Sequence, residues 1–335
     1  MVLDKLTYAG RRENLEGLEK SANFEFVVAD ITDGPKISSL LAERQPSGLI
    51  NFAAETHVDR SIDSPRAFIE TNIVGTFQLL EASRSYFKTL SPKDQKIFRY
   101  LHVSTDEVYG TLGKTGRFRE DSPYRPNSPY AASKAASDHL VQAYHVTYGL
   151  PTVITNCSNN YGPYQFPEKL IPLMILNALE GKSLPIYGDG KNVRDWIFVE
   201  DHCEGLWKVL TKGKCGETYN IGANEEHSNI EIVNTVCEVL ELFFPAAKNP
   251  NLVSKGIRGY DALKTFVKDR PGHDRRYAIN SAKMMKQLAW EPKLKFKDGI
   301  KKTVKWYLAH HEWCDQIQNN NYQRERLGLT SIKGT

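Results

Sequence analysis

Short runs of β-branched and aromatic residues alternate with helical patterns through the first half of the chain. This alternation favours parallel strands joined by crossover helices, because a parallel pair needs a long connection between its strands. The run GLINFAA is almost continuously apolar, which is typical of a strand buried on both faces. We therefore predict an α/β fold built on a doubly wound parallel sheet. The expected strands are 2–4, 24–30, 48–54, 98–105 and 152–157, and the expected helices are 37–44, 65–87 and 128–148.

The pattern loosens after about residue 160, where Pro and Gly become more frequent. Apolar residues return at helical spacing in four later segments. We therefore predict a second, smaller α/β region in this part of the chain. Its expected helices are 168–180, 199–212, 228–243 and 298–310.

Charge and cysteine content exclude several classes of protein. The 335 residues carry 44 basic and 40 acidic side chains, which are interleaved without a long basic run, so no nucleic-acid partner is indicated. The five cysteines include no CxxC pair, and no apolar stretch reaches the roughly 18 residues of a membrane span. His57, His310 and His311 have no metal-ligand partners at useful spacing. We expect a cytoplasmic protein with reduced thiols, no membrane contact and no bound metal.

Tyr130 and Lys134 are four residues apart in a segment that Ser128 and Pro129 predict to begin a helix. This spacing places both side chains on one helix face. An ammonium beside a phenol stabilises the phenolate, so a tyrosine in this position can remove a hydroxyl proton while a hydride leaves the same carbon. An exposed helical pair would show the same spacing, and the motif alone does not separate these alternatives.

The run LHVSTDEVYG is an expected buried strand that ends in Thr105, Asp106 and Glu107. Ligands of open α/β sheets gather at the carboxyl ends of strands, where these side chains would emerge. Two neighbouring carboxyl groups in a cleft can differ in pKa, so that one donates a proton and the other accepts one. A helix cap after the strand would explain one carboxylate better than two. We therefore predict an acid–base pair.

Three further segments have a physical interpretation. Asp4 follows the first expected strand and can accept hydrogen bonds from ribose hydroxyls, which would favour NAD over NADP; a turn carboxylate is the alternative. YGDGK at 187–191 lacks the GxxxxGK[ST] spacing of a phosphate loop, and we predict a hairpin turn. The mixed charges of 252–270 predict a solvated connection.

Several segments in combination resemble the nucleotide-sugar 4,6-dehydratases, a family of extended short-chain dehydrogenases, and among them those that act on dTDP-glucose. The resemblance runs from Val2 to about Tyr307 in the family's order. It implies a Rossmann-like fold, NAD as the cofactor, dTDP-glucose as the nucleotide-sugar substrate, and a homodimer. It also implies an NAD-binding domain at 1–160 and a mainly substrate-binding region at 161–335, with some segments returning to the NAD domain. The segments are STDEVYG, NSPYAASKAASD, NCSNNYGPYQFPEKLIP, YGDGKNVRDWIFVEDH, YNIG and DRPGHDRRYAI.

The resemblance assigns the chemistry to five residues. Thr105, Tyr130 and Lys134 match the triad of the superfamily, while Asp106 and Glu107 match the acid and base of its dehydratases. Asp106 would protonate the departing C6 hydroxyl, and Glu107 would take the C5 proton once C4 has been oxidised. The hydride would then return to C6. A related sugar-nucleotide epimerase or decarboxylase is the alternative enzyme, and similar epimerases usually lack the acid pair.

The resemblance also implies two sets of binding residues. A diphosphate needs cationic donors, and Arg adds bidentate geometry. The cofactor set is Asp4, Lys5, Thr7, Asp30, Ile31, Ala53, Ala54, Thr56, Thr71, Tyr130, Lys134 and Asn160. The substrate set is His57, Thr105, Asn159, Lys169, Leu170, Pro185, Tyr187, Arg194, Asn229, Asp269, Arg270 and His273.

The family pattern starts with a strand and a GxxGxxG turn. This sequence starts with MVLDKLTYAG, which resembles the second strand of that pattern. For the strand order 3-2-1-4-5-6, we expect an open slot between the strand at 2–4 and the strand near 98–105. Because the glycine turn supplies N–H groups to the pyrophosphate, we expect weaker NAD binding than in a chain extended by about 25–35 residues. A catalytically silent relative is a further hypothesis. The residues do not distinguish thymidine from uridine in the substrate.

Overall fold

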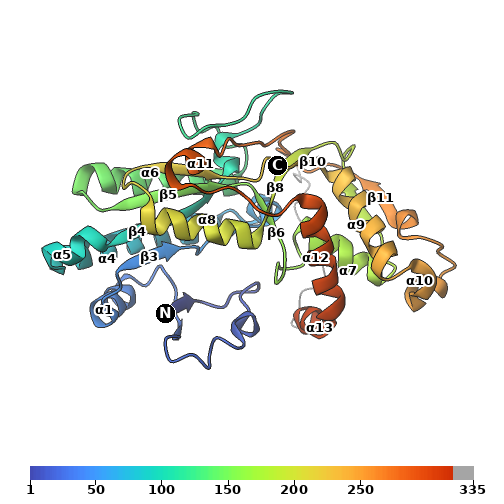
Figure 1. Ribbon diagram of the computed structural model, residues 1–335, viewed down its shortest axis with the longest axis horizontal. Coiled ribbons are helices and arrows are strands. Elements are labelled where there is room, and N and C mark those ends of the chain that lie inside the picture. Colours follow the sequence, from blue (N-terminus) through green and yellow to red (C-terminus); the bar gives the residue numbers. More distant parts are fainter. Residues whose placement is uncertain (320–335) are drawn as a thin grey trace, which may run out of the picture. The chain divides into compact units, whose positions relative to one another are not determined.

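The computed structural model describes residues 1–319, shown in Figure 1. Residues 320–335, the end of the predicted region 161–335, lie outside the described part. The chain divides into two compact units that interleave along the sequence. Unit 1 comprises Met1–Val108, Tyr124–Asn156 and Leu206–Tyr219, and unit 2 comprises Tyr109–Pro123, Cys157–Gly205 and the chain from Asn220.

Parallel strands form the sheets of unit 1. β1 (Val2–Asp4) pairs with β2 (Phe26–Val28) in a two-stranded sheet. β3 (Gly48–Asn51) pairs in parallel with β4 (Arg99–Thr105), and the order of that sheet is β3-β4-β5-β9. The predicted parallel α/β architecture is confirmed, and each predicted strand contains an observed one. The remaining two strands of the larger sheet are β5 (Thr152–Cys157) and β9 (Thr218–Ile221).

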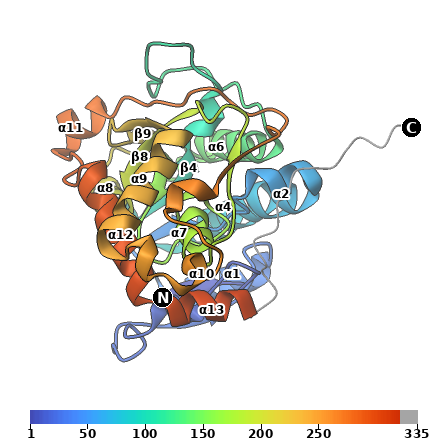
Figure 2. The ribbon, with the colours of Figure 1, turned by 90° about the vertical axis from the view of Figure 1, so that its right-hand side faces the viewer.

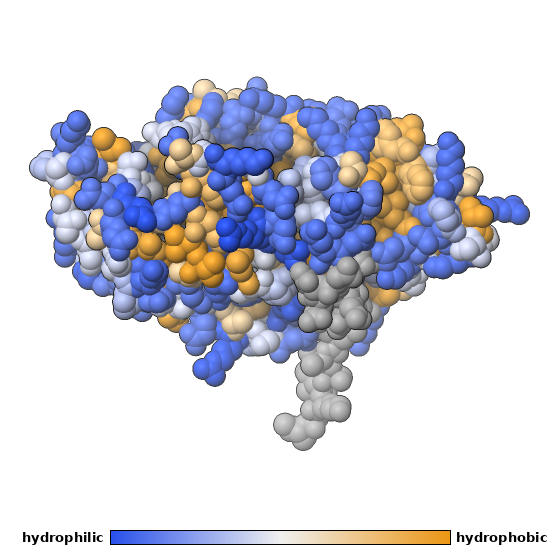
Figure 3. Space-filling view, turned by 90° about the horizontal axis from the view of Figure 1, so that it is seen from below, coloured by the Kyte–Doolittle hydropathy of each residue, from blue (hydrophilic) through white to orange (hydrophobic). Residues whose placement is uncertain are grey.

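The expected open slot is wrong in its position. β4 has a partner on each side, β3 and β5, whereas β3 is the edge strand of its sheet and is not paired with β1. In the order 3-2-1-4-5-6, strand 4 is the neighbour of strand 1. β3 corresponds to strand 4 of that order and β4 to strand 5, so the expected slot belongs beside β3. Val28, on β2 beside β1, is 60% exposed. Phe52, which directly follows β3, is 58% exposed. Apolar patches also reach the surface on the face seen from below in Figure 3.

The predicted helix 128–148 is confirmed as α6 (Pro129–Tyr148). The Ser128 hydroxyl caps it by accepting the Ala131 N–H, Pro129 occupies the first turn, and Gly149 ends it with a left-handed φ of 68°. α1 (Gly34–Arg44) begins one turn earlier than its predicted start, where Asp33 accepts the Lys36 N–H. The other helices that begin in unit 1 are the 3₁₀ turns Arg12–Leu15 and Asp106–Tyr109, α2 (Val58–Asp63), α3 (Arg66–Phe68), α4 (Thr76–Thr89) and α5 (Pro92–Ile97).

The predicted helix 65–87 is observed without a break from Arg66 to Thr89, but its centre is wound as a π-helix. A π-helix, Ile69–Gly75, separates α3 from α4. At its end, a side chain on Gly75 would place a Cβ 2.5 Å from Cδ1 of Ile31, so the close approach requires glycine. Asn72, inside the π-helix, accepts the Glu55 N–H at 2.8 Å and donates to the Ser133 hydroxyl at 2.8 Å. These tertiary contacts decide a local winding that helical periodicity does not encode.

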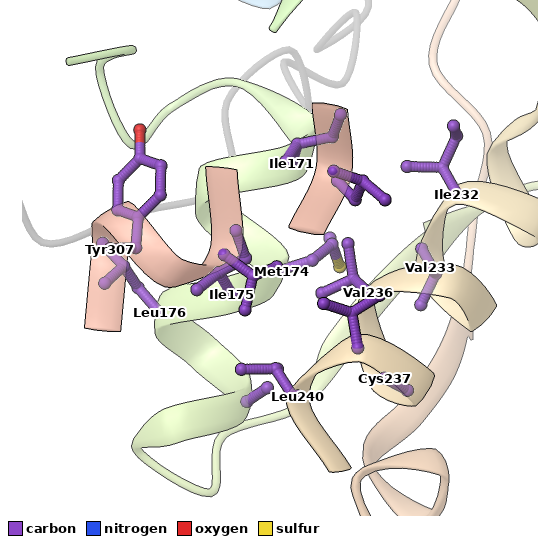
Figure 4. Packing of buried hydrophobic residues seen from close by; sticks show 14 of the residues in the cluster. Ile171, Met174, Ile175, Leu176, Ile232, Val233, Val236, Cys237, Leu240 and Tyr307 are labelled. Carbon is purple, nitrogen blue, oxygen red and sulfur yellow. The ribbon is translucent and has the colours of Figure 1, made fainter. Parts of the chain in front are cut away.

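The main apolar core of unit 2 lies among helices that pack against one another, as Figure 2 shows. They are α7 (Leu170–Leu179), α9 (Asn229–Phe243) and α12 (Phe296–Ala309). Figure 4 shows their buried aliphatic side chains interleaved, with Ile171 and Ile175 on α7 and Val236 on α9. Burial of each such side chain stabilises the fold by roughly 1.5–3 kcal/mol. Ser228 and Glu231 begin α9 with a reciprocal capping box.

The strands of unit 2 form two small sheets. One has the order β10-β8-β6, and the other pairs β11 with β7 in parallel. The strands are β6 (Asn159–Tyr161), β7 (Leu184–Tyr187), β8 (Val193–Phe198), β10 (Glu226–Ser228) and β11 (Lys264–Val267). The remaining helices are α8 (Val199–Lys212), the 3₁₀ turns Ala246–Lys248 and Tyr260–Leu263, α10 (Pro250–Val253), α11 (Ala282–Leu288) and α13 (His311–Asn319).

Two predictions for this part of the chain are wrong. The turn at 187–191 is not a hairpin, because β7 and β8, which it joins, belong to different sheets. The segment 252–270 is not simply a solvated connection, since it contains β11 and the fully buried Tyr260. Both errors arise because strand partners from distant parts of the sequence determine these structures. Within residues 1–319, no helix is long and apolar enough to cross a membrane.

We expect Gly299→Ala to destabilise the protein, although alanine normally favours a helix over glycine by about 1 kcal/mol. An added methyl group would overlap the Tyr161 hydroxyl, and that ring is held by Trp196, Phe198 and Phe296. Overpacking of this kind costs about 1–3 kcal/mol, so the free energy of unfolding in urea should fall. Gly113→Ala is the control, because no atom lies within 4 Å of its added Cβ. Equal stability of the two variants would contradict this packing.

Candidate active site

The end of β4 brings three predicted catalytic side chains into one turn. Thr105 Oγ1 lies 3.4 Å from Asp106 Oδ1 and accepts the Glu107 N–H at 3.3 Å. The Thr105 carbonyl accepts a hydrogen bond from Asn156 on β5 at 3.1 Å. Asp106 is buried, whereas Glu107 is partly exposed. The two carboxyl groups therefore differ in environment, as an acid and a base should.

α6 presents Lys134 to the same strand. Its Nζ donates to the Val103 carbonyl at 2.8 Å and lies 3.5 Å from Nε2 of His102. Tyr130 is one helical turn earlier, largely buried, with its ring edge-on to Phe68 at 6.3 Å. Since Val103 is two residues before Thr105 on β4, the structure brings the predicted catalytic residues together at one end of this strand.

Buried polar residues that the sequence analysis did not single out surround Lys134. His102 contacts Asn51 through Nδ1 at 3.3 Å and Asp138 through Nε2 at 3.4 Å. Asp138 is one turn after Lys134 on α6 and accepts hydrogen bonds from Ser104, Tyr124 and Asn156. Two sequence features could have indicated these residues. His102 is a histidine within the apolar segment 98–105, and Asp138 is an acid four residues after Lys134.

Part of the predicted cofactor set gathers at the ends of β1 and β2. Lys5 Nζ lies 3.3 Å from Asp30 Oδ2 and 3.3 Å from Thr71 Oγ1, which the π-helix brings there. Burial opposes the ionisation of Asp30, but the Thr32 N–H and the Lys5 ammonium outweigh it and lower the pKa of this carboxyl. Asp4, the last residue of β1, is exposed and accepts the Leu6 N–H at 2.6 Å. Carboxylates at these strand ends suit the hydroxyl groups of a ribose.

The remaining cofactor residues are dispersed. Ile31 is buried against Gly75, and Ala53 donates its N–H to Asn51. Thr7 and Thr56 are exposed, and Ala54 is partly buried. Asn160 differs from the rest because it belongs to unit 2. Its Oδ1 contacts His202 Nδ1 at 2.9 Å, and its amide donates to the Ser158 carbonyl at 3.1 Å.

Several predicted substrate residues converge in unit 2. Arg194 on β8 is buried, donates to the Asp274 carbonyl at 2.9 Å and stacks on Tyr277. His273 contacts Asp269 at 2.6 Å and lies edge-on to Tyr187. Burial first, and then the charges of Arg270 and Arg194, lower the pKa of His273 to about 4. The guanidinium groups of Arg270 and Arg194 therefore both lower the pKa of the His273 ring. We call these three residues the cationic cluster, and its two positive charges suit an anion.

The other substrate residues have varied positions. Lys169 precedes α7, which begins at Leu170, and the backbone N–H of Asn229 donates to Asn192 at 3.0 Å. Asn159 lies on β6 and Pro185 on β7. His57 belongs to unit 1, where its ring accepts the Arg60 N–H and caps α2. Among residues 1–319, no group of three His, Cys, Asp or Glu side chains could hold a metal ion.

We expect Arg270→Gln to raise the pKa of His273 from about 4 towards its ordinary value near 6.5, because a neighbouring positive charge is lost. NMR titration of the His273 ring would measure the shift. Arg275→Gln is the control, since this guanidinium pairs with Asp189 and is not a cause of the His273 shift. An unchanged His273 titration in Arg270→Gln would show that the cluster is not formed as described.

Comparison with known proteins identifies the family. A family model described as GDP-mannose 4,6 dehydratase matches residues 1–303. A dTDP-glucose 4,6-dehydratase of Xanthomonas campestris pv. campestris is 56% identical over 328 residues, which is 98% of this chain and 91% of that protein.

Solved structures give the same result. The crystal structure of dTDP-glucose 4,6-dehydratase from Bacillus anthracis in complex with NAD matches with a TM-score of 0.80 and 45% identity, over 94% of this chain and 89% of that one. An NAD complex of UDP-glucose 4-epimerase from Thermus thermophilus has a TM-score of 0.77 but 29% identity, over 92% and 91% of the two chains. The resemblance seen in the motifs is thus confirmed, and the chain belongs to the GDP-mannose 4,6 dehydratase family.

Proposed function

We propose that this chain is an NAD-dependent hydro-lyase that converts dTDP-glucose into the 4-keto-6-deoxy sugar and water. The observation that carries the proposal is the Asp106–Glu107 pair at the end of β4, beside the strand position where Lys134 is bound. The Bacillus anthracis and Xanthomonas campestris dehydratases support the choice of substrate and cofactor through their high identity. In this reading, unit 1 holds the cofactor and unit 2 mainly holds the substrate.

The residues of α6 and β4 account for oxidation at C4. The ammonium of Lys134 stabilises the phenolate of Tyr130, which removes the proton of the C4 hydroxyl and becomes a neutral phenol. Thr105 donates a hydrogen bond to the same sugar oxygen. Bound NAD supplies the hydride acceptor at C4 and afterwards the hydride donor at C6. Asp4 and Asp30 fit its adenosine end, because their carboxylates at the strand ends can accept hydrogen bonds from hydroxyl groups, and the Lys5 ammonium lies beside Asp30.

The two carboxyl groups account for the elimination. The C4 ketone acidifies the neighbouring C5 proton, which Glu107 removes as a base. Asp106 donates a proton to the C6 hydroxyl, which leaves as water, and the double bond forms between C5 and C6. C6 then gains hydride and C5 regains its proton from Glu107, which gives the 4-keto product. Tyr130 releases the proton that it took from the C4 hydroxyl and Asp106 takes up a proton, so both groups return to their starting states. Asp106 is the buried member of this pair, and Glu107 is the partly exposed one.

The cationic cluster of unit 2 is the proposed site for the diphosphate. Arg194 and Arg270 supply guanidinium donors, which can bind phosphate oxygens in bidentate geometry. Arg194 is already oriented by the Asp274 carbonyl and the Tyr277 ring, so less conformational entropy is lost when it binds an anion. Lys169 and Asn229 belong to the same proposed substrate set.

We also propose a cytoplasmic homodimer. α4 and α6 pack against each other in unit 1 and leave Phe77, Val146 and Tyr148 exposed, with Val146 at 73%. Arg84 lies over the Tyr148 ring at 4.5 Å, which orders part of this surface. Exposed apolar side chains on two adjacent helices suit a self-complementary contact with a second copy.

Incubation of the protein with dTDP-glucose and NAD, followed by assay of the 4-keto-6-deoxy product, tests the function. We expect Tyr130→Phe to fold normally but to lose roughly 10²–10⁴-fold in C4 oxidation, because the general base is absent. Circular dichroism of the variant controls for folding. Full activity of Tyr130→Phe would reject its role, and absence of product from the unaltered chain would reject the function itself.

Glu107→Gln separates elimination from oxidation, because the amide keeps the shape of the side chain but cannot accept the C5 proton. We expect the variant still to oxidise C4, seen as accumulated reduced nicotinamide. Exchange of the C5 proton with deuterated solvent should fall sharply, by roughly 10²–10⁴-fold. Exchange at the unaltered rate would place the base on another residue.

A further inference from the structure

Lys134 is a buried ammonium group that donates to an uncharged backbone carbonyl. The residue is 3% exposed, and Nζ donates to the carbonyl of Val103 at 2.8 Å. A buried charge is costly unless a counter-charge and hydrogen bonds compensate for lost hydration. The proposed chemistry needs this ammonium to stay protonated beside Tyr130. A carboxylate close to Lys134 would favour that protonated form.

His102 is a neutral group that lies close to both Lys134 and the Asp138 carboxylate. The Asn51 amide is oriented by the Ala53 N–H, which donates to Oδ1 at 3.1 Å, so the Asn51 Nδ2 faces His102 Nδ1 as a donor. His102 Nδ1 is then an acceptor, and the ring proton is on Nε2, 3.4 Å from Asp138 Oδ1. Burial, and then the charge of Lys134, lower the pKa of His102 to about 4. The ring is therefore uncharged at neutral pH.

Asp138 has the hydrogen-bond pattern of an ionised carboxylate. Its Oδ2 accepts from the Ser104 hydroxyl at 2.8 Å, the Tyr124 hydroxyl at 2.9 Å and the Asn156 amide at 3.3 Å. Its Oδ1 faces the His102 ring proton and makes no other hydrogen bond within residues 1–319. Such donors replace the lost water around a buried anion. α6 places this anion one helical turn from Lys134.

We propose that Asp138 is the counter-charge of Lys134 and that the neutral His102 ring positions the Asp138 carboxylate by donating to it from Nε2, which lies 3.4 Å from Asp138 Oδ1 and 3.5 Å from Lys134 Nζ. Both are positioning residues, because they act on the reaction through Lys134. The proposal rests on the proposed function, in which Lys134 stabilises the Tyr130 phenolate. It explains why two polar residues, His102 on β4 and Asp138 on α6, are buried next to Lys134.

The proposal has a defined consequence for pH dependence. A negative charge near Lys134 favours the ammonium but disfavours the phenolate of Tyr130. Asp138→Asn removes this charge, so the Tyr130 ionisation and the Lys134 deprotonation both move to lower pH. His102, Tyr124, Asp106 and Glu107 are the other titratable groups at this end of α6 and β4, and they are unaltered in the variant. A unit charge one or two helical turns away displaces a titration by about one pH unit.

Two measurements on the NAD-loaded protein test the proposal. The first is the pH profile of the rate of C4 oxidation, whose two limbs should both shift down by about one pH unit in Asp138→Asn. The second is independent of turnover: carbon-13 NMR of labelled tyrosine, with the Tyr130 signal assigned by its absence in Tyr130→Phe. Its ionisation midpoint should move in the same direction. Asp121→Asn, which removes an exposed charge, should change neither measurement.

Variants of His102 test its positioning role. His102→Gln keeps an N–H donor towards Asp138 and should retain the unaltered profile, whereas His102→Leu removes this donor but not the charge, so it should shift the profile in the same direction as Asp138→Asn but by less. A Tyr130 midpoint unmoved in Asp138→Asn overturns the counter-charge, and a Leu variant with an unmoved midpoint overturns the positioning role of His102. If the midpoint moves but the unaltered chain forms no product, the proposed function fails while this inference stands. Thermal unfolding of each variant verifies that it is folded.

Discussion

The hydrogen bond from Lys134 to the Val103 carbonyl is the contact on which the proposed catalytic site of unit 1 depends. It attaches α6 to β4 at 2.8 Å, two residues before Thr105. Because Tyr130 is one helical turn from Lys134, this single attachment sets the position of the phenol relative to the strand end. The buried polar groups behind it, His102 and Asp138, provide the hydrogen bonds and charge that a desolvated ammonium requires.

Unit 2 carries the two guanidinium groups, those of Arg194 and Arg270, that we propose bind the diphosphate. Arg194 lies on a strand and is fixed by a backbone carbonyl and an aromatic face, while Arg270 and His273 follow β11. The helical core of this unit supports those strands through packing that leaves no space for a side chain at Gly299. Arg194 is thus held on a regular strand, and a donor held in this way loses less entropy on binding.

Local signals gave most of the secondary structure and the motifs, and tertiary pairing explains the failures. Ser128, Pro129 and Gly149 mark the ends of α6 because capping depends on neighbouring residues alone. The turn at 187–191 looks like a hairpin locally, but β7 takes its partner from β11, far along the chain. The π-helix likewise depends on Asn72 contacts with Glu55 and Ser133, which no helical period contains.

The sequence by itself determined the alternation of strands and helices, the spacing of Tyr130 and Lys134, and the adjacent Asp106 and Glu107, because each is a local pattern. Membership of the dehydratase family followed from those motifs in combination. Only the tertiary structure decided that His102 and Asp138 stand behind Lys134, since one side chain comes from a strand and the other from a helix 36 positions later in the chain. Burial gives these polar groups their roles, and burial is a property of the packed fold rather than of any segment.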